Sequence, residues 1–183
     1  MAAELRPARA GDVDALLAIE EAVFGTDRLS RASFRRLVAS ASAAVLVADA
    51  DGKVAGYCIV LLRANSPAAR LYSIAVGPGR SGRGIGRMLI EAAERKARAR
   101  SCSALHLEVR EDNPRAIAIY GQSGFQITGS QPDYYEDGMT AVRMAKGLVH
   151  DDAVAGRVTG KETKRGGASF ARRTSKIPRR ATL

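Results

Sequence analysis

Glu108 and Tyr120 are residues of the types that move protons, and they lie twelve positions apart. Glu108 is near the end of segment 104–110, whose alternating apolar residues predict a strand, and Tyr120 is in the helix predicted after Asn113. A carboxylate can accept a proton, whereas a phenol with a pKa of about 10 is protonated at neutral pH and can donate one. The pair therefore suits general acid–base catalysis, in which one group removes a proton and the other supplies one. The alternative is a solvated glutamate and a core tyrosine, both of which are common.

A glycine-rich loop within segment 71–100 indicates a second kind of chemistry. Apolar residues that predict a strand lead into the loop, and a strongly helical sequence follows; its glycines are Gly77, Gly79, Gly82, Gly84 and Gly86. The first turn of a helix has amide groups without partners and partial positive charge, so a phosphate or diphosphate fits this end. Glycine lets the backbone approach such a ligand and adopt positive φ. Arg80, Arg83 and Arg87 add positive charge, and the alternative is a plain surface turn.

Three phosphate-binding patterns compete for this loop. A P-loop requires Lys-Ser or Lys-Thr after its last glycine, and no such pair follows here. The dinucleotide fingerprint G-x-G-x-x-G matches the first three glycines, but Pro78 interrupts the turn and no repeating strand–helix–strand array surrounds it. The third pattern, Gln/Arg-x-x-Gly-x-Gly/Ala, matches 81–86 with Ser81 at its first position. This third pattern fits best, because a cradle of backbone amides does not depend on the side chain of Ser81.

Secondary-structure patterns distribute these residues over a mixed α/β (α+β) sheet with flanking helices. Strands are predicted at 5–8, 43–48, 54–63, 69–76, 104–110, 125–128 and 139–145, with a hairpin turn at Asp51-Gly52. Helices are predicted after the cap candidates Asp12, Ser30 and Asn113 and after the glycine loop, the last with Glu94 facing outward. A right-handed crossover makes 104–110 parallel to 69–76, which would bring its end beside the glycine loop.

The block 107–125, LEVREDNPRAIAIYGQSGF, together with the glycine loop and the segment DYYEDG at 133–138, resembles the GNAT superfamily of N-acetyltransferases. Within it, the likeness is to bacterial ribosomal-protein-alanine acetyltransferases and their N-terminal acetyltransferase relatives, and it covers about residues 4–147. The resemblance implies a GNAT-like, mainly antiparallel sheet with a parallel pair at the cofactor cleft. It also implies acetyl-CoA as co-substrate, a protein N-terminus as acceptor, and no metal.

The resemblance further implies a role for individual residues. Glu108 corresponds to the general base and Tyr120 to the general acid of a direct transfer. Acetyl-CoA would be bound by Ile74, Ala75, Val76, Gly82, Arg83, Gly84, Ile85, Gly86, Arg87 and Asn113, mostly through backbone groups. Tyr134 and Tyr135 would lie over the substrate N-terminus. The family usually has a Pro-Trp pair in the first helix–helix loop, whereas this chain has Thr-Asp-Arg at 26–28 and no Trp.

Composition separates a folded part from a basic tail. The 183 residues are 46% apolar and carry a net charge of +10, which suits one domain. From Asp151 onward the sequence contains nine basic and three acidic residues, and large apolar residues are few. The expected organisation is therefore a domain at 1–147 and a basic, disordered tail at 148–183. Cys58 and Cys102 lack metal-site spacing, and neither a signal peptide nor a membrane-length apolar run is present, so a cytoplasmic protein is expected.

The acceptor is the least defined part of this prediction. An α-amine has a pKa of about 7.7 to 8.0, against about 10.4 for lysine, so its deprotonation at neutral pH costs about 3 to 4 kcal/mol less. A modest base suffices for an α-amine. The same chemistry on a small amine or a lysine is an alternative. A more distant one is nucleic-acid or ribosome contact through the basic tail, in which Phe170 is the sole aromatic residue available for stacking.

Overall fold

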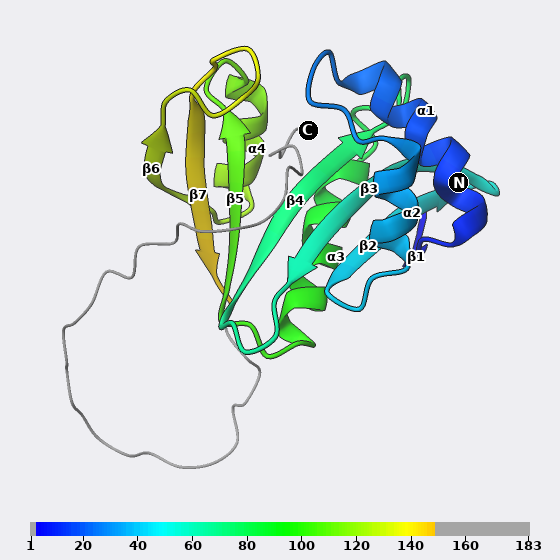
Figure 1. Cartoon of the computed structure of the whole chain (residues 1–183), viewed down its shortest axis with the longest axis horizontal. Helices are drawn as coiled ribbons and strands as arrows, with labels where there is room; N and C mark the ends of the chain where they lie inside the picture. Colours follow the sequence, from blue (N-terminus) through cyan, green and yellow to red (C-terminus); the bar gives the residue numbers. More distant parts are fainter. Residues whose placement is uncertain (1–2, 149–183) are drawn as a thin grey trace.

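The computed structural model describes residues 3–148, and its centre is a seven-stranded sheet in the order β1-β2-β3-β4-β5-β7-β6 (Figure 1). Along the chain the elements are β1 (Glu4–Pro7), the 3-10 turn η1 (Ala10–Asp12), α1 (Val13–Val23), α2 (Arg31–Val38), β2 (Ala43–Ala50), β3 (Lys53–Leu62), β4 (Ala68–Val76), α3 (Ile85–Arg98), β5 (Ala104–Arg110), α4 (Pro114–Gln122), β6 (Gln126–Gln131) and β7 (Ala141–Gly147). Neighbouring strands are antiparallel except β4 and β5, which are parallel. The predicted mixed sheet is confirmed, while the predicted basic tail lies outside the described residues from position 149 onward.

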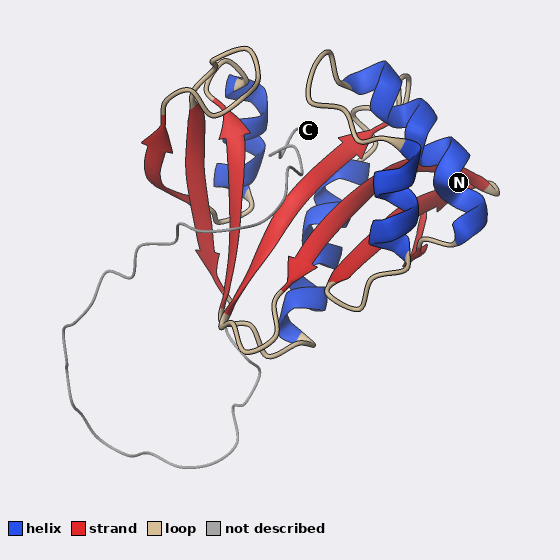
Figure 2. Ribbon diagram, in the orientation of Figure 1, coloured by secondary structure: helices blue, strands red, loops and turns tan. Residues whose placement is uncertain are grey.

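Helices cover both faces of the sheet, as Figure 2 shows. Successive side chains of a strand point to opposite faces, so β3 serves two cores at once. Tyr57 and Ile59 pack with residues of α1 and α2 on one face. Cys58 and Val60 pack with residues of α3 and α4 on the other. The near-continuous apolar sequence of β3 therefore reflects a strand that is buried on both sides.

The predicted turn and caps are largely as the sequence indicates. Ser30 and Asn113 each accept a hydrogen bond from an N–H in the first turn of the following helix, at 3.1 and 3.0 Å. The hairpin turn at 51–52 has positive φ at both residues, 57° and 74°, which is the geometry of a type I′ turn. Asp12 differs, because its carboxylate accepts from the N–H of Arg9 at 2.6 Å and closes the 3-10 turn instead of capping α1.

The predicted outward position of Glu94 on α3 is wrong, since this residue is 5% exposed. Its Oε1 accepts a hydrogen bond from Nζ of Lys146 on β7 at 2.7 Å, and the same Nζ donates to the carbonyl of Ser123 at 2.8 Å. A buried carboxylate requires such a partner. Helical periodicity alone could not reveal it, because the lysine comes from a strand 52 residues later. The ion pair joins α3 to β7 and to the end of α4.

The parallel strands β4 and β5 pair over three positions and then separate. Ala68, Ala69 and Arg70 align with Ala104, Leu105 and His106, and the ladder ends there. Beyond this point β4 keeps β3 as its partner and β5 keeps β7, so the two strands diverge (Figure 1). The predicted parallel pairing is therefore confirmed, but the end of β5 is not hydrogen-bonded to the strand that enters the glycine loop.

Gly56 on β3 is in close contact with α3 and β4 and leaves no room for a side chain. We therefore expect Gly56→Ala to destabilise the fold. A Cβ there would lie 2.8 Å from the carbonyl oxygen of Ala75 and 3.2 Å from side-chain atoms of Ile85 and Leu89. Overpacking of this kind costs about 1–3 kcal/mol. Urea unfolding measures the loss, with Gly147→Ala as control, because a Cβ at that strand glycine meets nothing within 4 Å. Equal stability of the two variants would contradict the expectation.

Candidate active site

The glycine loop between β4 and α3 is open and shaped by backbone conformation. Gly79, Gly82 and Gly84 have φ of 73°, 79° and 75°, the left-handed region that favours glycine. A Cβ at any of the three would meet nothing within 4 Å, so conformation and not crowding requires glycine. Gly84 is the N-cap of α3 and provides no side-chain cap. The first amides of α3 thus face an open, glycine-lined surface that suits an anion.

Basic side chains lie around this surface, whereas the side chain of Ile85 points away from it. Arg83 and Arg87 are exposed, and Arg87 pairs with Glu91 one turn along α3 at 3.1 Å. The side chain of Ile85 is buried in the core, so its backbone is the part that faces the loop. The arrangement offers backbone amides with exposed, positively charged side chains around them, which fits a diphosphate.

Strand β4 contributes a backbone edge next to this loop. Ile74 and Ala75 are fully buried, and Val76 is partly buried, so their side chains belong to the core. The ladder to β5 ends at Arg70, which leaves the β5-facing edge of residues 74–76 outside that ladder. A ligand with amide groups could pair with such an edge as a neighbouring strand would.

Glu108 is held in a chain of polar contacts that crosses the diverging strands. Its Oε2 accepts a hydrogen bond from Nε of Arg70 on β4 at 2.8 Å, and Nη2 of Arg70 donates to the Tyr134 hydroxyl, also at 2.8 Å. Burial lowers the pKa of Arg70 more than any other single cause raises it, but the charge of Glu108, the neighbouring Tyr134 and Tyr72 and the hydrogen bond to Glu108 together outweigh burial, and the pKa is raised. Oε1 of Glu108 has no partner within residues 3–148. The carboxylate is therefore fixed by one oxygen and available through the other.

Arg70 was missed by sequence reasoning. The sequence offers one signal, an arginine within the mostly apolar strand β4. Its position beside His106, two residues before Glu108, is seen only in the structure. The parallel register of β4 and β5 makes this a pair across strands, and that register is set by the fold and not by local sequence.

Tyr120 and Tyr135 are buried tyrosines whose hydroxyls have no hydrogen-bond partner within the part of the chain that the structure describes. Burial raises the pKa of Tyr120 well above 10, with smaller contributions from Tyr135 and Cys58. Burial also raises the pKa of Tyr135, and the charges of Tyr134 and Glu108 add to this. A tyrosine buried for packing alone usually finds a partner for its hydroxyl. Tyr135 is close enough to Glu108 and to Tyr120 for electrostatic interaction, so the two hydroxyls fit a site whose ligand supplies the missing partners.

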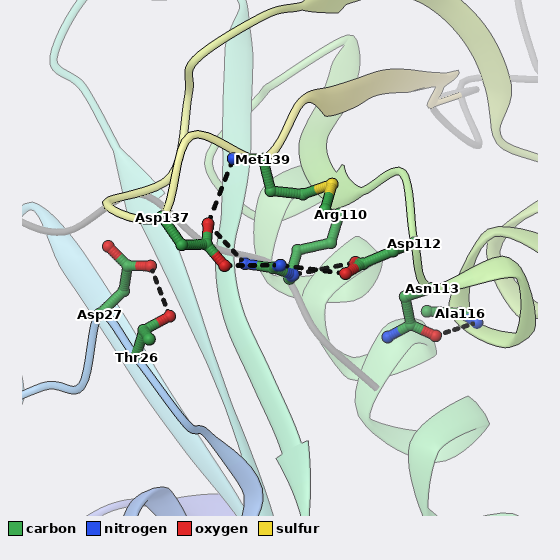
Figure 3. A network of polar contacts seen from close by, with 8 residues as sticks. All are labelled: Thr26, Asp27, Arg110, Asp112, Asn113, Ala116, Asp137 and Met139. Carbon is green, nitrogen blue, oxygen red and sulfur yellow. Dashed lines mark hydrogen bonds and ion pairs between the residues drawn. The ribbon is translucent and has the colours of Figure 1, made fainter.

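A cavity of about 300 Å³ lies between the α1–α2 loop and the end of β5. Its lining residues are Val23, Phe24, Gly25, Thr26, Asp27, Arg110, Tyr135 and Asp137. Arg110 donates to Asp137 at 2.8 and 3.2 Å and to Asp112 at 2.9 and 3.0 Å, and Asp137 also accepts from the N–H of Met139 (Figure 3). These hydrogen bonds from Arg110 hold the pKa of both aspartates below its ordinary value. They fasten the loop before β7 to the end of β5.

The structure brings some of the predicted site residues together and gives others a further role. Tyr134 and Tyr135 stack edge to face at 5.2 Å, and Tyr134 reaches Glu108 through Arg70. Oδ1 of Asn113 caps α4, which leaves its side-chain amide nitrogen for other contacts. No helix within residues 3–148 could span a membrane. Over the same residues, no cluster of His, Cys, Asp or Glu is arranged to hold a metal ion.

Comparison with known proteins identifies the family. The model of the acetyltransferase (GNAT) family matches residues 13–125. A Bacillus subtilis protein, provisionally named ribosomal protein bS18-alanine N-acetyltransferase, is 30% identical over 135 residues, which cover 74% of this chain and 88% of that protein. Streptothricin acetyltransferase of Streptomyces lavendulae is 38% identical over 87 residues, or 48% of this chain and 46% of that protein.

A solved structure shows the same architecture. The ribosomal-protein-S18-alanine N-acetyltransferase of Escherichia coli superimposes with a TM-score of 0.73 at 26% identity, covering 84% of this chain and 99% of that one. The matched family region contains the glycine loop, Glu108 and Tyr120. The chain therefore belongs to the acetyltransferase (GNAT) family and is an acyltransferase.

Proposed function

We propose that this protein transfers the acetyl group of acetyl-CoA directly to the α-amino group of a protein N-terminus. The observation that carries the proposal is the carboxylate of Glu108, fixed by Arg70 on one oxygen and close to the buried Tyr135, whose hydroxyl, like that of Tyr120, has no partner within residues 3–148. Relatives and solved structures named as ribosomal-protein-alanine N-acetyltransferases support an N-terminal acceptor at the level of the family. A ribosomal protein is the acceptor that these names suggest.

The residues that would hold acetyl-CoA are those of the glycine loop and the β4 edge. Amides of 82–87 at the start of α3 would bind the diphosphate, and Arg83 and Arg87 would add charge. The backbone of 74–76 and the amide nitrogen of Asn113 would bind the rest of the molecule. Acetyl-CoA supplies an acyl group already activated as a thioester. No side chain of the protein is needed to form an acyl intermediate.

Glu108 would remove the proton from the attacking amine, directly or through one water. An α-amine with a pKa of about 7.7 to 8.0 is mostly protonated at neutral pH, so a base raises the reactive fraction. The ion pair with Arg70 fixes the side chain in one orientation, and Oε1 is the oxygen left to take the proton. Arg70 is a positioning residue in this scheme, because it acts through Glu108 and Tyr134.

Tyr120 would give its proton to the departing thiolate. Burial raises the pKa of its hydroxyl well above 10, so the group stays protonated throughout the neutral range. The absence of a partner within residues 3–148 leaves that proton free to be donated. Tyr134 and Tyr135 would flank the acceptor amine. Tyr135 is close to both other groups, because, in addition to burial, the charge of Glu108 raises the pKa of Tyr135 and the charge of Tyr135 raises the pKa of Tyr120.

A small amine is the second candidate acceptor, and the streptothricin acetyltransferase relative favours it. The wider likeness to ribosomal-protein-alanine acetyltransferases, over 74% of the chain, favours a protein N-terminus. We further propose a cytoplasmic location, because the two cysteines of the folded part are buried and free, as suits a reducing compartment.

The test combines binding with acceptor profiling of the full chain. Calorimetry should show acetyl-CoA binding without comparable binding of NAD, the ligand of the competing loop pattern. Mass spectrometry would then compare peptides with a free α-amine, peptides with a blocked α-amine and a free lysine, and streptothricin. Acetylation of the first set supports the proposal, whereas acetylation of streptothricin alone would replace it with the second candidate.

Gly84→Val should weaken acetyl-CoA binding about tenfold or more. The residue has φ of 75°, and a β-branched side chain in this region is strained by about 1–3 kcal/mol, which displaces the first amides of α3. Gly11→Val is the matched control, because Gly11 lies in the turn before α1 and a Cβ there meets nothing within 4 Å. Calorimetry on both variants measures the difference, and equal dissociation constants would mean that the loop does not bind the ligand.

A further inference from the structure

Asp27 is a carboxylate buried in the wall of the cavity described above. The residue is 8% exposed and lines the cavity from the α1–α2 loop. Its φ of 52° is in the left-handed region, which Asp and Asn tolerate better than most residues. The hydrogen bond observed for its carboxylate comes from the hydroxyl of the adjacent Thr26 at 3.2 Å (Figure 3). An uncharged hydroxyl is a weak partner for a buried negative charge.

The basic side chains of this region are engaged elsewhere. Arg110 is bound by the two aspartates Asp112 and Asp137. Arg28, next in sequence to Asp27, donates its Nε to the carbonyl of Phe24 at 2.7 Å. Within residues 3–148, no cation lies within ion-pair distance of Asp27. Within the described part of the chain, the carboxylate of Asp27 therefore has one hydrogen bond, from a hydroxyl, and no ion-pair partner.

A second feature of the cavity also indicates a ligand. Tyr135 lines the cavity, is 5% exposed, and its hydroxyl has no partner within the described part of the chain. The charge of Asp27 is among those that raise the pKa of Tyr135, so the two polar groups are near each other. Val23 and Phe24 give the same cavity an apolar side. A long aliphatic stem ending in a positive charge matches such a lining.

We propose that this cavity binds a lysine or arginine side chain that lies close behind the reacting amine of the acceptor, with Asp27 accepting its hydrogen bonds. The inference rests on the proposed function, because it places the reacting amine at Glu108. Glu108 and Arg110 share one face of β5 and are about 7 Å apart at two strand residues. The cavity at Arg110 is therefore one or two peptide residues beyond the amine.

Asp27 fits this role better than the other aspartate of the cavity. Asp137 already accepts two hydrogen bonds from Arg110 and one from the N–H of Met139, so its charge is balanced.

The test uses the full chain and short peptides that begin with alanine and carry Arg, Lys, Gln or Glu at the second or third position. We expect kcat/KM for the Arg or Lys peptide to exceed that for the Gln peptide about tenfold or more, as a charged hydrogen bond allows. Asp27→Asn should bring this ratio close to one, and asparagine keeps the backbone conformation. Asp14→Asn is the matched control, because Asp14 is exposed on α1 and pairs with Arg31. Its ratio should equal that of the unmodified chain.

Two results would overturn the inference while leaving the proposed function intact. One is equal kcat/KM for basic and neutral peptides in the unmodified chain. The other is an equal loss for all peptides in Asp27→Asn, which would mean that Asp27 binds the reacting amine or shapes the loop. Failure to acetylate any of the peptides would contradict the proposed function itself, and the inference with it.

Discussion

Glu108→Gln should lower kcat about 10²- to 10⁴-fold at pH 7, the range typical of losing a general base. Glutamine has the same shape and can still accept the hydrogen bond from Arg70 through its amide oxygen, so the fold should be kept. The loss should shrink as the pH rises through about 8, because the α-amine then loses its proton without help. Steady-state rates between pH 6 and pH 9.5 measure this.

The shape of the pH profile separates catalysis from binding. A loss that is the same at every pH would show that Glu108 binds the acceptor and does not take its proton. Glu111→Gln is the matched control, since this glutamate is exposed just beyond β5 and its loss also removes one negative charge. Its profile should follow that of the unmodified chain.

Tyr120→Phe should lower kcat about 10²-fold or more and leave the dissociation constant of acetyl-CoA nearly unchanged. The proton of the leaving thiolate would come from water instead of a positioned phenol. Because the Tyr120 hydroxyl has no partner within residues 3–148, its removal breaks no hydrogen bond of the described fold. The variant should therefore be at least as stable as the unmodified chain, while activity falls.

Tyr57→Phe provides the opposite case and serves as the comparison. Tyr57 is also fully buried, but its hydroxyl donates to Glu20, a buried carboxylate that also accepts from the N–H of Leu29. Loss of that bond should cost about 1–3 kcal/mol of stability with little effect on kcat at a temperature where the chain is folded. Thermal melting and single-turnover rates on both variants measure the contrast. Unchanged rates for Tyr120→Phe would remove Tyr120 from the mechanism.

Local patterns predict much of this fold because the determinants are close in sequence. The hairpin at 51–52, the caps Ser30 and Asn113, and the junction of strand, glycine loop and helix each depend on residues within one turn or one strand. The alternation in β5 likewise indicates which residues face the core and which, like Glu108, do not. Each of these local features lies where the sequence predicts it.

Features that depend on register or on distant partners were beyond the sequence. The contact of Arg70 with Glu108 requires the parallel register of β4 and β5, and the burial of Glu94 requires a lysine from β7. The cavity at Asp27 forms where the α1–α2 loop meets the end of β5, two segments far apart in the chain. The Tyr120 hydroxyl lacks a partner because of the side chains that surround it in the fold. The spacing of residues in the sequence does not reveal those neighbours.

Because the ladder between β4 and β5 is short, the junction of the two halves of the sheet depends largely on contacts other than strand pairing. The sub-sheets β1–β4 and β5–β7 share three aligned residue pairs, so few inter-strand hydrogen bonds oppose their parting. A molecule that bridges the two sub-sheets adds RT ln(1 + [L]/Kd) to the folded state, about 2.7 kcal/mol at one hundred times Kd. Acetyl-CoA bound as proposed, to the β4 edge and to Asn113 beyond β5, would hold the two sub-sheets together and raise the free energy of unfolding.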